Sequence, residues 1–108
     1  MTTERLPREE RAAAMRSARR TALLAAALAE AAEHGYRNIT RDAVARRAGL
    51  AAGSVNHEFE TVEGLRNAVM TEAIETGALD IIRQGIANAD PLAVAAPAEL
   101  KTAALATI

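Results

Sequence analysis

The most informative segment of this chain is residues 40–59, which read TRDAVARRAGLAAGSVNHEF. Thr40 stands where a helix N-cap would, directly before a helix-compatible run over residues 41–48. Gly49 is suited to end that helix, and within three residues the segment 52–59 can begin a second short helix. The pattern therefore predicts two short helices joined by a tight glycine turn.

The side chains of this segment fit the packing of a helix-turn-helix. That motif needs a small residue where the helices cross, which Ala45 supplies, and a turn residue tolerant of positive φ, which is Gly49. Its apolar anchors are Val44, Ala48, Leu50, Val55 and Phe59. Ser54, Asn56 and His57 remain free to point outward, and side chains of this kind contact base edges and phosphates in the major groove. We therefore expect a helix-turn-helix that binds double-stranded DNA.

The flanking segments predict further helices. Residues 18–34 carry an apolar stripe at helical spacing that stops at Gly35, whereas residues 8–20 are either part of this helix or a loose arm. A second stripe runs from Thr61 to Ile86 and predicts a long fourth helix, the longest of the chain, with a kink or close helix crossing at Gly77. Residues 97–107 predict a weak last helix.

We therefore expect an all-α fold in which a three-helix bundle with a helix-turn-helix is followed by a long fourth helix and a short, weak C-terminal helix. The expected divisions are a basic amino-terminal arm or helix extension (1–17), the helix-turn-helix bundle (18–60), a supporting and dimerising helix (61–88) and a C-terminal tail or short helix (89–108). With one Phe and one Tyr, the core should be only marginally stable alone, and burial against a second copy would help. The apolar face that is either a dimer interface or monomer core comprises Met70, Ile74, Ile81 and Ile82.

Charge is unevenly distributed along the chain. The net charge is −1, but residues 1–57 carry a net charge of +4 and residues 58–108 a net charge of −5. Every cation of the first half is Arg, which makes bidentate contacts with phosphate and guanine. If residues 5–20 are helical, Arg5, Arg8, Arg16, Arg19 and Arg20 lie within about 120° of one another. This stripe is either a solvated helix face or a DNA-binding arm.

Several other functions are not indicated. The chain has no Cys, which excludes disulfides and thiol catalysis, and its longest uncharged apolar stretch, residues 21–29, is shorter than a membrane span of about 20 residues. His57 and Glu58 begin a zinc-protease pattern, but Thr61 occupies the position of the second histidine, and His34 fits a helix end better than a metal site. We expect no catalytic residue, metal, cofactor or membrane partner, and a cytoplasmic, nucleoid-associated location.

Several motifs in order resemble the TetR-type transcriptional repressors across roughly residues 20–75. They are Ala26, Glu33-His34-Gly35-Tyr36, Ile39-Thr40-Arg41-Asp42-Ala43-Val44-Ala45, Ala48-Gly49-Leu50, Gly53-Ser54-Val55, Phe59 and Leu65. The resemblance implies a homodimeric repressor on a palindromic operator, with Thr40, Arg41, Gly53 and Ser54 meeting DNA. The full set of candidate DNA-binding residues is Thr40, Arg41, Ala52, Gly53, Ser54, Asn56, His57, Arg19 and Arg20.

The chain departs from that family in two respects. Where this chain has Asn56 and Glu58, the family usually has Tyr and His, and it usually has a Lys close to the position of Val62. In addition, Glu58 and Glu60 would repel the DNA backbone. About 20 residues follow Asn88, too few for the family's helical ligand-binding domain, so we expect no small-molecule inducer. The alternative is a protein-interaction module whose helix-turn-helix scaffold has lost DNA binding.

Overall fold

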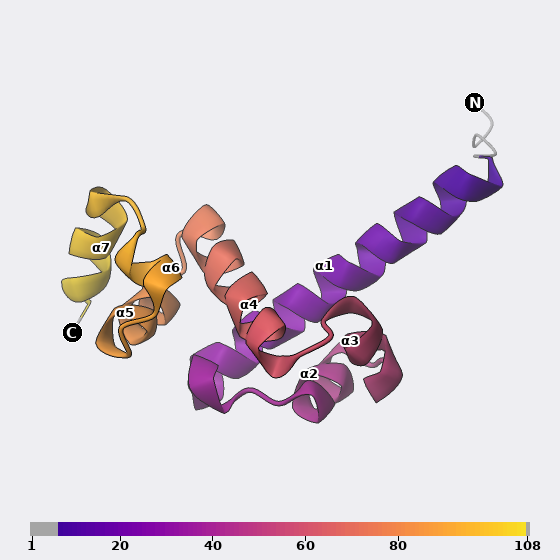
Figure 1. Ribbon diagram of the computed structural model, residues 1–108, viewed down its shortest axis with the longest axis horizontal. Coiled ribbons are helices and arrows are strands. Elements are labelled where there is room, and N and C mark those ends of the chain that lie inside the picture. Colours follow the sequence, from indigo (N-terminus) through magenta and orange to yellow (C-terminus); the bar gives the residue numbers. More distant parts are fainter. Residues whose placement is uncertain (1–6, 108) are drawn as a thin grey trace.

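A computed structural model describes residues 7–107, and every regular element in that range is a helix (Figure 1). The all-α prediction is confirmed. The elements are α1 (Arg8–His34), the 3-10 turn η1 (Tyr36–Asn38), α2 (Arg41–Ala48), α3 (Ala52–Glu58), α4 (Val62–Thr76), α5 (Leu79–Ala87), α6 (Pro91–Val94) and α7 (Ala98–Leu105). None of these helices is both long enough and apolar enough to cross a membrane.

Residues 8–20 are part of the first helix and not a loose arm, because α1 is continuous from Arg8 onward. Glu9 and Glu10 lie in its first turn, where acidic side chains complement the helix dipole, and it ends at Gly35 with φ of 93°. Its second half is buried against the rest of the chain, whereas its first half projects away from the body (Figure 1). The predicted helix therefore extends through the described part of the arm, while Arg5 lies outside the described residues.

The core of the amino-terminal half forms where α1, α2, α3 and α4 meet. Leu23 and Ala27 of α1, Val44 of α2, Val55 of α3 and Leu65 of α4 are each fully buried. Alanines at the contact points let the helices approach closely, which explains how a chain with two aromatic residues closes a core. This packing fixes the position of α3 relative to α1.

The predicted long helix over residues 61–88 is wrong, because the structure has two helices there and α1 is the longest helix of the described chain. Gly77 adopts the left-handed conformation (φ 74°, ψ 36°) and ends α4. The amide of Ala78 then donates to the carbonyl of Ala73 (2.8 Å), and α5 starts in a new direction at Leu79. Gly77 is thus a helix terminator and not a kink within one helix.

The break turns the expected dimer face inward. Helix α5 packs against α4, α6 and α7, so Met70, Ile81 and Ile82 are at most 2% exposed, and Ile74 is half-buried against the same core. The sequence left open whether this face is a dimer interface or part of the monomer core. The structure supports the monomer core for Met70, Ile81 and Ile82, because other helices of the same chain cover them. The expected last helix is present as α7.

Candidate nucleic-acid interface

The turn between α2 and α3 has the geometry that its sequence predicts. The Thr40 hydroxyl accepts a hydrogen bond from the amide of Ala43 (3.1 Å) and caps α2. Gly49 ends α2 in the left-handed conformation (φ 73°, ψ 28°), and the amide of Leu50 donates to the carbonyl of Ala45 (2.9 Å). Ala45 itself is 2% exposed at the helix crossing. These contacts hold the two short helices in a helix-turn-helix.

The side of α3 that faces away from the core carries the predicted contact residues. Ala52, Gly53, Asn56 and His57 are exposed, and Ser54 is half-buried. A Cβ added at Gly53 would have no atom within 4 Å, so close packing against α1 does not require this glycine. The surface over Gly53 is therefore open to a partner that approaches the backbone of α3.

Three of the predicted residues meet around one surface hollow. Thr40 and Arg41 at the start of α2, Asn56 of α3 and Val62 at the start of α4 line it together with Asp42, and its volume is about 290 Å³. The Arg41 guanidinium donates to the carbonyl of Glu60 (3.3 Å). The structure thus brings the start of α2 next to the exposed side of α3.

Glu58 is not the free negative charge that the sequence predicts. Its carboxylate pairs with the guanidinium of Arg20 (3.5 Å), and its side chain is 14% exposed. The same guanidinium lies over the ring of Phe59, 4.8 Å from the ring centroid. Arg20 therefore fastens the end of α3 to α1 and partly neutralises the acid that we expected to repel DNA, whereas Glu60 is exposed. Arg19, the other candidate on α1, is half-buried.

A second ion-paired contact, which sequence reasoning missed, joins α1 to α2. The Arg47 guanidinium donates to Glu30 (2.7 Å) and Glu33 (2.9 Å), and Glu33 also lies 2.8 Å from the imidazole of His34. The hydrogen bond to Glu30 is the main cause of the raised pKa of Arg47. Although Glu30, Glu33 and His34 are close enough together to suggest a metal site, Arg47 occupies the two carboxylates. The sequence feature that could have indicated this contact is Glu30, an acidic residue within the apolar stripe of α1.

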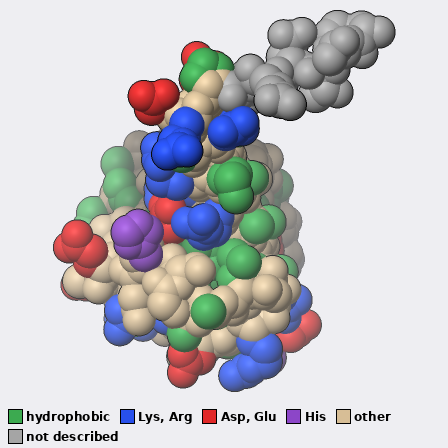
Figure 2. All heavy atoms as spheres, turned by 90° about the vertical axis from the view of Figure 1, so that its right-hand side faces the viewer, with side chains coloured by type: hydrophobic (Ala, Val, Ile, Leu, Met, Phe, Trp, Pro, Cys, Tyr) green, Lys and Arg blue, Asp and Glu red, His purple; other side chains and the backbone are tan. Residues whose placement is uncertain are grey.

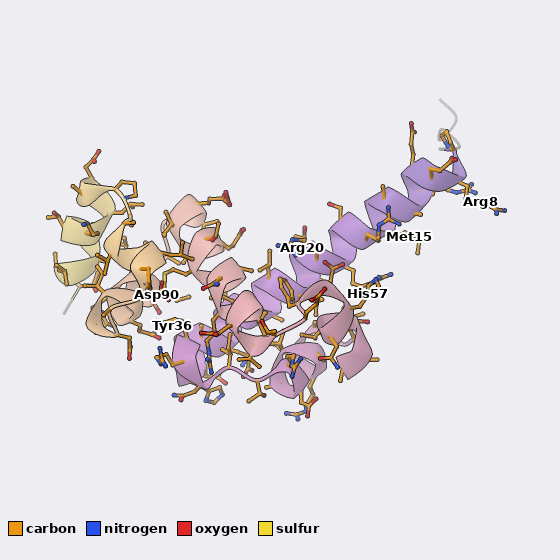
Figure 3. The ribbon with its side chains drawn as sticks, in the orientation of Figure 1. Arg8, Met15, Arg20, Tyr36, His57 and Asp90 are labelled. Carbon is orange, nitrogen blue, oxygen red and sulfur yellow. The ribbon has the colours of Figure 1, made fainter. Side chains whose placement is uncertain are left out.

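A third contact missed from the sequence joins η1, directly after α1, to the carboxy-terminal helices (Figure 3). The amide of Tyr36 donates to the side chain of Gln84 (2.7 Å), and its hydroxyl donates to Asp90 (3.2 Å). Burial, and then the nearby Asp90 carboxylate, raise the pKa of Tyr36. These bonds fix α5 and α6 against the helix-turn-helix unit.

Comparison with known proteins identifies this unit. The family model described as bacterial regulatory proteins of the tetR family matches residues 23–69, which run from the buried half of α1 to the middle of α4. Neither the curated proteins nor the solved structures include a significant match. The matched range contains the capped α2, the glycine turn and α3 in the arrangement described above. Residues 23–69, less than half of the chain, therefore resemble the helix-turn-helix region of the tetR family of bacterial regulatory proteins, and this match supports a DNA-binding domain over that range.

Proposed function

We propose that this chain is a sequence-specific regulator that binds double-stranded DNA through α3 and represses transcription as a homodimer without a small-molecule inducer. The observation that carries the proposal is the exposed polar side of α3 beside the hollow that Thr40, Arg41 and Asn56 line. An α-helix presented in this way fits the major groove of B-DNA. Because a transcriptional regulator of this kind acts while bound to DNA, we also propose a cytoplasmic, nucleoid-associated location.

The residues of the interface divide into two roles. Asn56 and His57 extend from the exposed side of α3, where an amide can pair with adenine in the major groove. Thr40, Arg41 and Ser54 lie at the start of α2 and on α3, where a hydroxyl or a guanidinium binds phosphate. Ala52 and Gly53 are exposed and present only a methyl group or bare backbone, so α3 can approach the duplex closely at its first turn.

Dimerisation requires another surface than the one expected from the sequence. Leu92 and Val94 of α6 and Leu105 of α7 are the large apolar side chains that remain exposed on the carboxy-terminal helices, at 37%, 48% and 48%. We propose that a second copy covers this part of the surface. Side chains of the chain itself, including Met70 of α4 and Ile82 of α5, fill the core against which α6 and α7 pack, which supports regulation without a ligand inside the described helices.

The competing proposal is a protein-interaction module in which the helix-turn-helix is only a scaffold. The exposed acid Glu60 and the exposed apolar side chains of α6 and α7 favour it. The pairing of Glu58 with Arg20 weakens it, because one of the two acids on which it rests is partly neutralised.

Selection of bound sequences from a random duplex library tests the proposed function. We expect a palindrome whose half-sites are centred roughly 34 Å apart, because two copies would place α3 in successive major grooves. Asn56→Ala should select a more degenerate sequence at one position of each half-site, whereas Arg41→Ala should weaken binding to all sequences equally. Enrichment of no sequence by a folded protein would contradict sequence-specific binding, and a single unpaired half-site would contradict the homodimer.

A further inference from the structure

The first half of α1 stands clear of the rest of the molecule (Figure 1). Over residues 8–20 only Ala12 and Arg19 are half-buried, and all other side chains are exposed. The segment carries five arginines and two glutamates, so it is strongly basic. Figure 2 shows arginine side chains (blue) gathered on the projecting helix, on the face of the molecule that lies at the right of Figure 1.

The arginines are not spread evenly around this helix. At 100° per residue, the Cα atoms of Arg8, Arg16, Arg19 and Arg20 fall within an arc of about 120°. By the same geometry, four of the five buried residues of the second half fall within the same arc (Leu23, Ala26, Ala27 and Glu30), and Ala31 lies about 20° beyond its edge. The face of α1 that packs on the helix-turn-helix therefore continues outward as a row of arginines, which we call the arginine stripe (Arg8, Arg16, Arg19 and Arg20).

The direction of the arginine stripe is confirmed at its inner end. Arg20 contacts Glu58 at the end of α3 and the ring of Phe59, so the stripe points to the side of α1 on which α3 lies. In Figure 3, Arg8 and Met15 lie on the projecting half of α1, and His57 lies on α3 beside the helix. From Arg20 to Arg8 the helix rises about 18 Å. A duplex bound to α3 would therefore lie next to the arginine stripe and not on the opposite side of the protein.

We propose that the projecting half of α1 is a second DNA contact, in which Arg8 and Arg16 bind the phosphate backbone outside the groove that α3 enters. This inference rests on the proposed function. Each strand of B-DNA carries a phosphate about every 3.4 Å along the helix axis, so the roughly 12 Å from Arg8 to Arg16 spans several phosphates. The contact adds affinity and lengthens the bound segment, but it does not read sequence.

Charge favours a duplex over a second copy of this chain as the occupant. Two arginine stripes facing each other would repel, and the alanines between them offer little area for a helix-helix contact. Guanidinium groups, by contrast, match phosphate oxygens in both charge and geometry. Met15 is 65% exposed at the edge of the stripe, and its isolated position makes no continuous apolar seam for another helix.

The first test is the salt dependence of binding to a random-sequence duplex. The double variant Arg8→Gln with Arg16→Gln keeps helix-forming residues and should lower the slope of log affinity against log salt by about 1.8, because each phosphate contact contributes about 0.9. Lys101→Gln removes a cation from α7, at the far end of the molecule, and should leave the slope unchanged (Figure 1).

The outcomes separate this inference from the proposed function. If the unaltered protein binds DNA but the double variant has the same slope, the second contact is refuted while the proposed function stands. If the unaltered protein does not bind DNA, both fail. If the double variant loses self-association in sedimentation and keeps its slope, the stripe binds a second copy and the inference is overturned.

The absence of cysteine allows a second test that does not depend on affinity. Met15→Cys places a single thiol beside the stripe, and Thr102→Cys places one on an exposed position of α7. With a photoactivatable maleimide on each thiol, we expect cross-linking to a bound duplex from position 15 and not from position 102. Equal yields from both positions, or none from position 15, would refute the contact.

Discussion

Replacing Gly85 by Ala tests the packing that holds the carboxy-terminal helices on the domain. Gly85 is buried in α5, and a Cβ there would lie 2.5 Å from the Met70 Cε atom and 2.6 Å from the Ala93 Cβ atom. The Met70 methyl group can move, but the Ala93 Cβ is fixed to the backbone of α6, so α6 must shift. Overpacking of this kind costs about 1–3 kcal/mol.

A matched control comes from Gly53, which is also helical but meets no atom within 4 Å. Alanine is favoured over glycine within a helix by about 1 kcal/mol, and this gain applies at both positions. We therefore expect Gly53→Ala to be neutral or stabilising and Gly85→Ala to lower the free energy of unfolding by about 1 kcal/mol net, within a range of roughly 0–2 kcal/mol. The two variants should differ by about 1–3 kcal/mol.

The assay is thermal and urea unfolding followed by circular dichroism. For a domain of this size, a loss of 1 kcal/mol lowers Tm by roughly 4–8 °C. Ala93→Gly should recover part of the loss in the Gly85→Ala protein, because it removes one of the two close atoms. If the two alanine variants are equally stable, α5 does not pack on α4 and α6 as the structure shows.

Three further substitutions have defined outcomes. Thr40→Ala removes the cap of α2 and should lower the free energy of unfolding by about 1 kcal/mol in urea titrations, whereas Thr40→Ser should not. Tyr36→Phe should lose about 0.5–1.5 kcal/mol with the bond to Asp90. Folding raises the pKa of Tyr36, so its protonated hydroxyl stabilises the fold fully below the ordinary pKa of 10.0, and this stabilisation is lost as the pH rises through the raised pKa. Above pH 10, the free energy of unfolding should therefore fall less in the Phe variant than in the unaltered protein. Glu58→Gln releases Arg20 and removes a negative charge, and it should raise DNA affinity at low salt in anisotropy titrations; a lower affinity in a folded variant would show that the ion pair positions α3.

Local signals carried most of the sequence-based prediction of the helix-turn-helix. Thr40 and Gly49 act within one or two turns of their own helices, so the cap and the left-handed turn follow from residue type alone. The burial of Ala45 and Val55 follows from their spacing, because the helices must cross at a small residue.

The errors arose where two helices could continue or break. Gly77 is tolerated inside a helix at a modest cost and is also a good terminator, and only the packing of α5 against α4 decides between these outcomes. Once the chain turns there, Ile81 and Ile82 point into the monomer instead of toward a partner. An apolar face gives no indication of which surface covers it.

Long-range polar contacts could not be predicted from the sequence. Arg20 and Glu58 lie far apart along the chain, as do Tyr36 and Asp90, and nothing local links either pair. Such contacts follow from the completed fold. They nevertheless alter the interpretation of the site, because the pairing of Arg20 with Glu58 partly neutralises an acid expected to repel DNA and braces the end of α3 against α1.

The central claim is that residues 40–59 present a DNA-binding surface, and a salt titration tests it most directly. The measurement is fluorescence anisotropy of a labelled random-sequence duplex, titrated with the full chain and with Arg41→Ala over a series of salt concentrations. We expect log affinity to fall linearly with log salt and Arg41→Ala to lower the slope by about 1. Absence of binding by the folded protein at the lowest salt concentration would contradict it.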